Sequence, residues 1–138
     1  MNRARREAIY IPGLTHKNPI PAACRVGNML YSGGIHGVDP ETGTMPEGLD
    51  RQAAHMFRHM QAIVEAAGGS LEDIIKVTVW LRDRSHRPLI NIPWLEMFPD
   101  PKTRPARHTM NGVLDGEMQV QCDFIAVLPL EADAALAR

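Results

Sequence analysis

Cysteine, long apolar runs and an excess of charge of either sign are all scarce in this sequence. The 138 residues include two cysteines, Cys24 and Cys122, which have neither a CxxC spacing nor a histidine cluster nearby. This pattern disfavours a zinc site and a redox pair, so we expect two reduced thiols. Cys122 alternates with apolar residues and is expected to face the core.

The ends and the charge of the chain exclude further classes. Residues 1–7 are basic, but no apolar run follows them before Pro12, which predicts neither a signal peptide nor a membrane span. The expected location is the cytoplasm. The net charge is -1 and the basic residues are scattered, so no nucleic-acid partner is expected.

What the sequence does contain is enough apolar material for one core. Hydrophobic residues make up 44% of the 138 residues, which suits a single domain spanning residues 1–138. No regular element is expected in the approach segment, residues 8–23. Residues 24–34 predict a hairpin with its turn at Gly27-Asn28, and the glycine-rich stretch from Gly33 to Gly43 predicts a loop.

A first amphipathic helix is predicted over residues 49–67, where apolar residues recur at steps of three and four. Asp50 favours its start, and Gly68-Gly69 favours its end. His55 and His59 lie four apart on it, which is a metal-ligand spacing. No glutamate or third ligand accompanies them in an HExxH arrangement, so a solvated helix flank is favoured over a metal site.

The second half of the chain predicts strands around a second helical stretch. Alternation predicts a strand in which Ile75, Val77, Val79 and Leu81 carry the apolar face. Residues 86–98 are predicted to be helical mainly in their later part, because Pro88 and Pro93 interrupt the earlier part; the apolar character there comes from Leu89, Ile90, Leu95 and Met97.

Two further strands complete the predicted sheet. They cover residues 104–109 and residues 118–127, and the latter alternates an apolar face with a polar one. Strands that precede, separate and follow two helices predict an α+β sandwich with both helices on one sheet face. The tail, residues 131–138, is expected to be frayed or a short helix.

The candidate functional residues lie on these last two strands. Arg107 follows Pro105-Ala106 on a rigid backbone, which suits a bidentate carboxylate clamp, and a surface salt bridge is the alternative. Gln121 and Asp123 are two apart and so share a strand face, where they contact a ligand, solvent or a wet subunit interface. His108 points away from Arg107 and is expected to be a packed or edge histidine.

These segments, taken in order, resemble the RidA (YjgF) family of imine and enamine deaminases over about residues 19–127. The resemblance rests on RVGNMLYSGG followed by VDPETG, on IVEAAGGSLEDIIKVTV, on the helix with Asn91 and Phe98, on RPARHT and on VQCDFIAV. It implies a chorismate-mutase-like fold, with a mixed sheet and two helices on one face. It also implies a homotrimer with sites in the clefts between subunits.

The resemblance also implies roles for single residues. The arginine of the family's PAR motif, which binds the substrate carboxylate, is Arg107, and a backbone contact follows it near Thr109. The glycine of the family's SGQ turn falls on Gly34, whose amide would help to hold the substrate. A tyrosine common in the family falls at Ile20, so one aromatic wall of the usual pocket is absent here.

The closing strand departs from the family's Glu-x-Glu pattern and reads Gln121-Cys122-Asp123. An amide can place a water molecule but cannot take its proton, so the chain is expected to be slower, to use Asp123 as the proton carrier or to prefer another substrate. The first hypothesis is a cofactor-free, metal-free hydrolytic deaminase that converts a small carboxylate-bearing imine or enamine to a 2-oxo acid and ammonia. The alternative is a ligand-binding or chaperone-like trimer that keeps Arg107 but catalyses weakly; a ribonuclease role is disfavoured by the charge.

Overall fold

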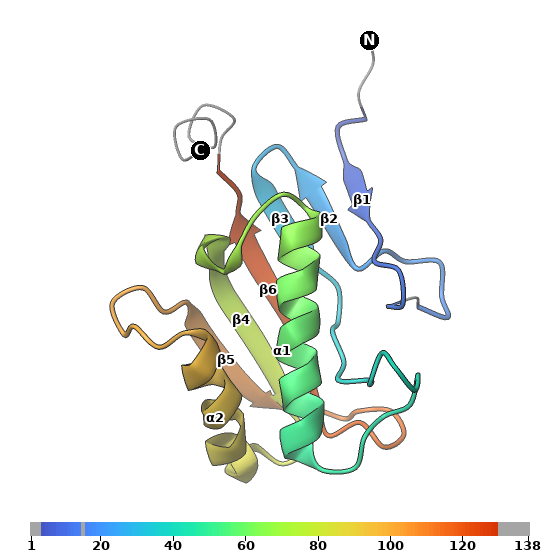
Figure 1. Ribbon diagram of the computed structural model, residues 1–138, viewed down its shortest axis with the longest axis vertical. Coiled ribbons are helices and arrows are strands. Elements are labelled where there is room, and N and C mark those ends of the chain that lie inside the picture. Colours follow the sequence, from blue (N-terminus) through green and yellow to red (C-terminus); the bar gives the residue numbers. More distant parts are fainter. Residues whose placement is uncertain (1–3, 15, 130–138) are drawn as a thin grey trace.

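The computed structural model describes residues 4–14 and 16–129 and consists of one six-stranded sheet with two helices on one of its faces (Figure 1). The strands lie in the order β1-β2-β3-β6-β4-β5; β4 and β5 are parallel, and all other neighbours are antiparallel. The elements are β1 (Glu7–Ile9), β2 (Ala23–Val26), β3 (Met29–Ser32), α1 (Leu49–Ala66), β4 (Ile74–Leu81), α2 (Arg87–Met97), β5 (Ala106–Asn111) and β6 (Val120–Val127). The α+β prediction is confirmed. The tail expected to be frayed or helical, residues 131–138, lies outside the described residues.

The predicted hairpin is present, and it is extended by a strand that the sequence did not predict. Val26 pairs with Met29 across the two-residue turn, where Gly27 adopts a φ of 60° that favours glycine. β1 pairs with β2 at the edge of the sheet. With three residues, β1 is too short to reveal a period of two, because its regularity comes from its partner strand.

Helix α1 begins at the predicted residue and ends one residue early. Gly68 follows it with a φ of 91°, a conformation that stops a helix. The predicted apolar stripe is buried: Ala53, Phe57, Met60 and Val64 are each at most 1% exposed. The buried Gln52 beside this stripe holds two loops, since its amide donates to the carbonyls of Pro46 and Glu117 and accepts from the Gln119 amide.

Strand β4 is correctly predicted, but its first apolar residue is not. Val77, Val79 and Leu81 are fully buried, whereas Ile75 is 50% exposed and Ile74 takes the core position. A bulge between Ile74 and Lys76 inserts one extra residue, which reverses the alternation at that point. A simple period of two cannot detect such an insertion.

The second helix corrects the sequence prediction. α2 is regular from Arg87 onward, because Pro88 occupies the first turn, where no intrahelical amide donor is needed, and Pro93 is accommodated within the helix. Its core side chains are Ile90 and Trp94, four residues apart, whereas Leu89 and Leu95 are exposed. Leu89 and Leu95, which supply part of the predicted apolar character of this stretch, therefore lie outside the core.

Candidate active site

The sequence-predicted site residues lie on two different faces of the sheet. Arg107 is directly opposite Val77, which is fully buried beneath the helices, so Arg107 lies on the helix-covered face. Asp123 is opposite Thr78, the next residue along β4, and therefore lies on the open face. Within one chain the guanidinium of Arg107 and the carboxylate of Asp123 thus do not meet.

Arg107 is held in place by helix α2. Its Nη2 donates a hydrogen bond of 2.8 Å to Oδ1 of Asn91, and its Cζ lies 5.0 Å from the centroid of the Trp94 ring. A cation at this distance from an indole is attracted to the ring. These two contacts fix the plane of the guanidinium without using all of its donors.

The remaining donors of Arg107 are available to a ligand. Nη1 is buried and has no hydrogen-bond partner among the described residues. Burial lowers the pKa of Arg107, and nearby Arg87 lowers it further, yet an arginine of this kind stays charged at neutral pH. A buried donor without a partner is costly, and an anion would relieve that cost. Thr109, two residues further on, is half-buried on the same face.

The open face carries the amide and the carboxylate predicted from β6. The indole Nε1 of Trp80 donates a hydrogen bond of 3.1 Å to Oδ2 of Asp123. Oδ1 has no hydrogen-bond partner in the part of the chain that the structure describes. The amide of Gln121 lies against Gly34, where any side chain would overlap Nε2 of Gln121. Gly34 is therefore needed for Gln121 to occupy its position.

His108 lies on the open face as well. It is opposite Thr78, which is itself opposite Asp123, so one row across three strands holds His108, Thr78 and Asp123. The prediction that His108 points away from Arg107 is confirmed, and it lies on the edge strand β5. The alternative that it is packed is wrong, because its side chain is exposed.

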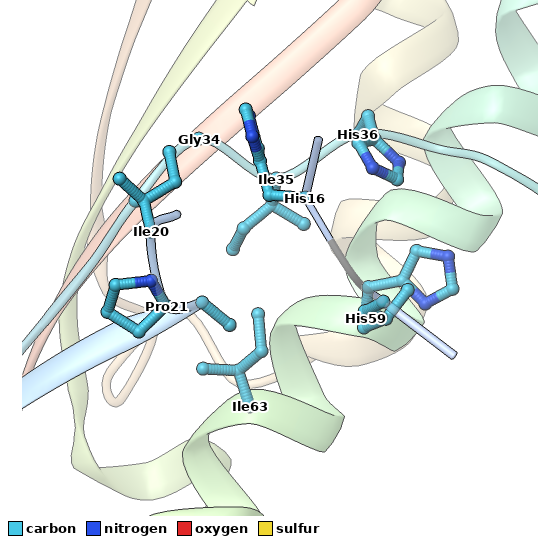
Figure 2. A pocket seen from close by; sticks show the side chains of 11 residues that line it. His16, Ile20, Pro21, Gly34, Ile35, His36, His59 and Ile63 are labelled. Atoms are coloured by element: carbon cyan, nitrogen blue, oxygen red, sulfur yellow. The ribbon is translucent and has the colours of Figure 1, made fainter. Parts of the chain in front are cut away.

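Gly34 and Ile20 come together at a small pocket between the start of the chain and helix α1 (Figure 2). The cavity is small, with a volume of about 50 Å³. The walls are mostly apolar, for example Pro21, Ile35 and Ile63, but three histidines also line the pocket: His16, His36 and His59. We call it the histidine pocket.

His59 corrects the prediction of a solvated helix flank. It is 6% exposed, and its Nε2 donates a hydrogen bond of 2.7 Å to the carbonyl oxygen of Val38. Burial lowers the pKa of His59, so the ring is neutral near pH 7. The sequence could not predict this burial, because the loop that covers His59 has no periodic pattern. The described residues hold no group of three or more side chains arranged to bind a metal ion.

Three residues that position the candidate site were not singled out from the sequence. Asn91 and Trp94 hold Arg107 from α2, and Trp80 binds Asp123 from β4. The spacing of Asn91 and Trp94, three apart on a helix, puts them on one side of α2 and was the available signal. Trp80 alternates with core residues of β4, so the alternation placed it on the polar face of that strand.

No helix among the described residues combines the length and the apolarity that crossing a membrane requires.

The comparisons of this sequence with known proteins all indicate one family. The family model for endoribonuclease L-PSP matches residues 15–128. A RutC family protein of Aquifex aeolicus is 34% identical over 120 residues, covering 82% of this chain and 95% of that protein. A 2-iminobutanoate/2-iminopropanoate deaminase of Dermatophagoides farinae is 34% identical over 112 residues, covering 80% of this chain and 86% of that protein.

Solved structures agree with the sequence comparisons. The crystal structure of RidA from an Antarctic Psychrobacter superposes with a TM-score of 0.77 at 32% identity, covering 91% of this chain and all of that one. The six-stranded mixed sheet with two helices on one face is accordingly the chorismate-mutase-like fold. With the model match and the relatives taken together, this chain belongs to the RidA (YjgF) family.

Proposed function

We propose that the protein is a hydrolytic deaminase of small 2-imino or enamine acids, which it converts to 2-oxo acids and ammonia. The observation that carries this proposal is the Arg107 guanidinium, which Asn91 and Trp94 hold while Nη1 stays buried without a partner among the described residues. A fixed fork of donors suits a carboxylate, which accepts two parallel hydrogen bonds. The names of relatives at about a third identity agree with this chemistry.

The reaction needs no redox partner. The oxygen of water bonds to the imine carbon, the nitrogen takes up protons, and the carbon–nitrogen bond then breaks to release ammonia and leave a carbonyl. Arg107 binds the substrate carboxylate, and Gln121 orients the water. Asp123 exchanges protons with the water and the nitrogen, using the oxygen that Trp80 leaves free.

We further propose that each site is shared between subunits of a homotrimer. Arg107 and Asp123 lie on opposite faces of one sheet, so a site that uses both takes them from different copies. No helix of residues 4–14 or 16–129 covers the open face (Figure 1), which carries apolar cross-strand pairs, Tyr31 with Ile125 and Met29 with Val127. Tyr31 is 55% exposed in the single chain, as expected for a side chain that a second copy covers.

Assembly is the first expected outcome. Sedimentation velocity at micromolar concentration is expected to give a species of about 46 kDa, three times the 15.3 kDa of one chain. Tyr31→Lys should shift the distribution toward monomer, because it places a charge in an apolar contact. Glu72→Lys, a change of charge on the exposed 3-10 turn before β4, is the matched control. A native protein that sediments as a stable monomer contradicts the shared site.

A second function is favoured by one observation, the amide at position 121. A trimer that binds carboxylates without rapid hydrolysis would need Arg107 but no proton carrier beside the water. On this alternative the protein binds 2-oxo acids and leaves imines to hydrolyse in solution.

Turnover separates the two functions. An amino-acid oxidase generates 2-iminobutanoate in place, and a scavenging amine competes with the protein for it. The deaminase is expected to suppress formation of the amine adduct at catalytic concentrations, with 2-oxobutanoate as the product. Absence of suppression at catalytic concentrations, together with binding of 2-oxobutanoate, supports the binding protein instead.

A further inference from the structure

The histidine pocket differs chemically from the rest of the candidate site. Its walls are mostly apolar, and among the described residues no aspartate, glutamate, lysine or arginine lines it. The polar groups in it are the rings of His16, His36 and His59, together with backbone (Figure 2). The pocket borders Gly34, and the Gln121 amide lies against the same glycine, so Gly34 links the pocket to the candidate site.

Backbone groups fix which nitrogen of each ring carries the proton. The amide of Val38 donates to Nδ1 of His36 at 3.3 Å, so a neutral His36 carries its hydrogen on Nε2. The amide of Asn18 donates to Nδ1 of His16 at 2.9 Å, with the same consequence. The pocket therefore has two N–H donors that these contacts leave unused.

His59 has the same tautomer, but its N–H group is already used. Its Nε2 donates to the carbonyl of Val38, which leaves Nδ1 as an acceptor in the neutral ring and as a third donor after protonation. The rings of His36 and His59 are 6.3 Å apart in an edge arrangement. A ligand acceptor between these rings would meet the Nε2–H group of His36, and it would meet a second donor on the other side once His59 is protonated.

The charges around the pocket favour an anion. His55 and Arg58 on α1 face His59 along with Asp39 of the loop, and His16 faces His36. Burial is the main cause that lowers the pKa of both His36 and His59, the hydrogen bond to Val38 opposes this at His59, and the neighbouring basic side chains lower both pKa values further. Of these neighbours only Asp39 is acidic, and it raises the pKa of His59. A bound carboxylate would act in the same direction as Asp39 and draw a proton onto the pocket.

We propose that the histidine pocket receives a second carboxylate, carried at the end of a short side chain, and that His36 selects dicarboxylic substrates. This inference rests on the proposed deaminase. The small size of the cavity suits a short chain that ends in a carboxylate. The apolar walls contact the methylene groups, and the N–H groups of His16 and His36 bind the terminal oxygens.

The test compares two ligands that differ only in this end group. 2-Oxoglutarate and 5-methyl-2-oxohexanoate share the 2-oxo acid, and their side chains have the same number of heavy atoms and nearly the same shape. Calorimetry at pH 7 is expected to show that 2-oxoglutarate binds at least about tenfold more tightly. Its binding should take up protons, seen as a heat that changes with the ionisation enthalpy of the buffer, and should weaken as pH rises.

Two variants test whether His36 causes the preference for 2-oxoglutarate. His36→Phe keeps an aromatic ring but removes the donor, so it should abolish the preference and leave the affinity for 5-methyl-2-oxohexanoate within about threefold. His55→Phe alters a histidine that stacks on His59 without lining the pocket, and the preference should persist. Circular dichroism confirms that both variants are folded.

Three outcomes overturn the proposal: equal affinities, a preference for the apolar ligand, or a preference unchanged in His36→Phe. Failure of both ligands to bind at millimolar concentration also overturns it. The proposed deaminase stands or falls separately, on turnover of 2-iminobutanoate, which has no second carboxylate. A protein that turns over this imine but does not prefer 2-oxoglutarate keeps its function and loses the subsite.

Discussion

Replacing Arg107 by lysine is expected to lower kcat/KM for 2-iminobutanoate by about 10- to 100-fold, although the positive charge is kept. A lysine ammonium cannot make the two parallel hydrogen bonds that fix a carboxylate, and bonds to charged groups are worth about 1.5–3 kcal/mol. It also loses the planar contact with Trp94 and the hydrogen bond to Asn91 together. Steady-state kinetics and the affinity for 2-oxobutanoate measure the effect, and both should fall.

The choice of control follows from the structure. Arg104 is unsuitable, because its side chain donates to the carbonyls of Phe98 and Pro99 and so supports the loop before β5. Arg51→Lys is the matched change, since Arg51 is exposed in the first turn of α1. If Arg107→Lys binds and turns over substrate as well as Arg51→Lys does, the carboxylate is bound elsewhere.

Much of the fold could be predicted because periodicity reports burial directly. The stripe on α1 and the alternation on β6 each follow from one buried face, and both are present in the structure. The failures have a common cause: the surroundings of a residue in the fold, and not only its own sequence pattern, decide whether it is buried or helical. Ile75 is exposed because of a bulge opposite β6, and Pro88 begins a helix because its missing amide falls where none is needed.

The candidate site could be predicted residue by residue but not as an arrangement. A period of two correctly pairs Gln121 with Asp123 on one face, yet it says nothing about the phase of β5 relative to β6. That phase depends on the parallel register of β5 against β4, which puts Arg107 beside Val77 and His108 beside Thr78. Register between distant strands depends on packing, and here it separates the cation from the carboxylate within one chain.

Asp123→Asn is expected to have the second large effect, lowering kcat by about 100-fold or more while the affinity for 2-oxobutanoate changes little. The amide keeps the size of the side chain and can still accept the hydrogen bond from Trp80, but it cannot exchange a proton. Gln121→Glu is the complementary change, which adds an acid beside Gly34. It should raise turnover of small 2-imino acids and introduce a pH dependence that reports the new carboxyl group.

Each alternative gives a different pattern for these two substitutions. If the native protein is only a binding protein, native and Asp123→Asn are equally inactive, and Gln121→Glu alone exceeds the rate in solution. A fast native rate that neither substitution changes removes both residues from the chemistry and leaves substrate-assisted hydrolysis on Arg107.

Mixing two inactive variants tests whether Arg107 and Asp123 of different copies form one site. Arg107→Ala and Asp123→Asn are each expected to be nearly inactive alone. After the subunits are unfolded and refolded together in equal amounts, a site between two copies receives its native arginine half of the time and its native aspartate half of the time. About a quarter of the sites should then be intact, and about a quarter of the native activity should return. A site built within one chain cannot be restored in this way, because every chain carries one of the two substitutions. No recovery in correctly assembled mixed trimers would therefore contradict the shared site, even if each substitution alone abolishes turnover.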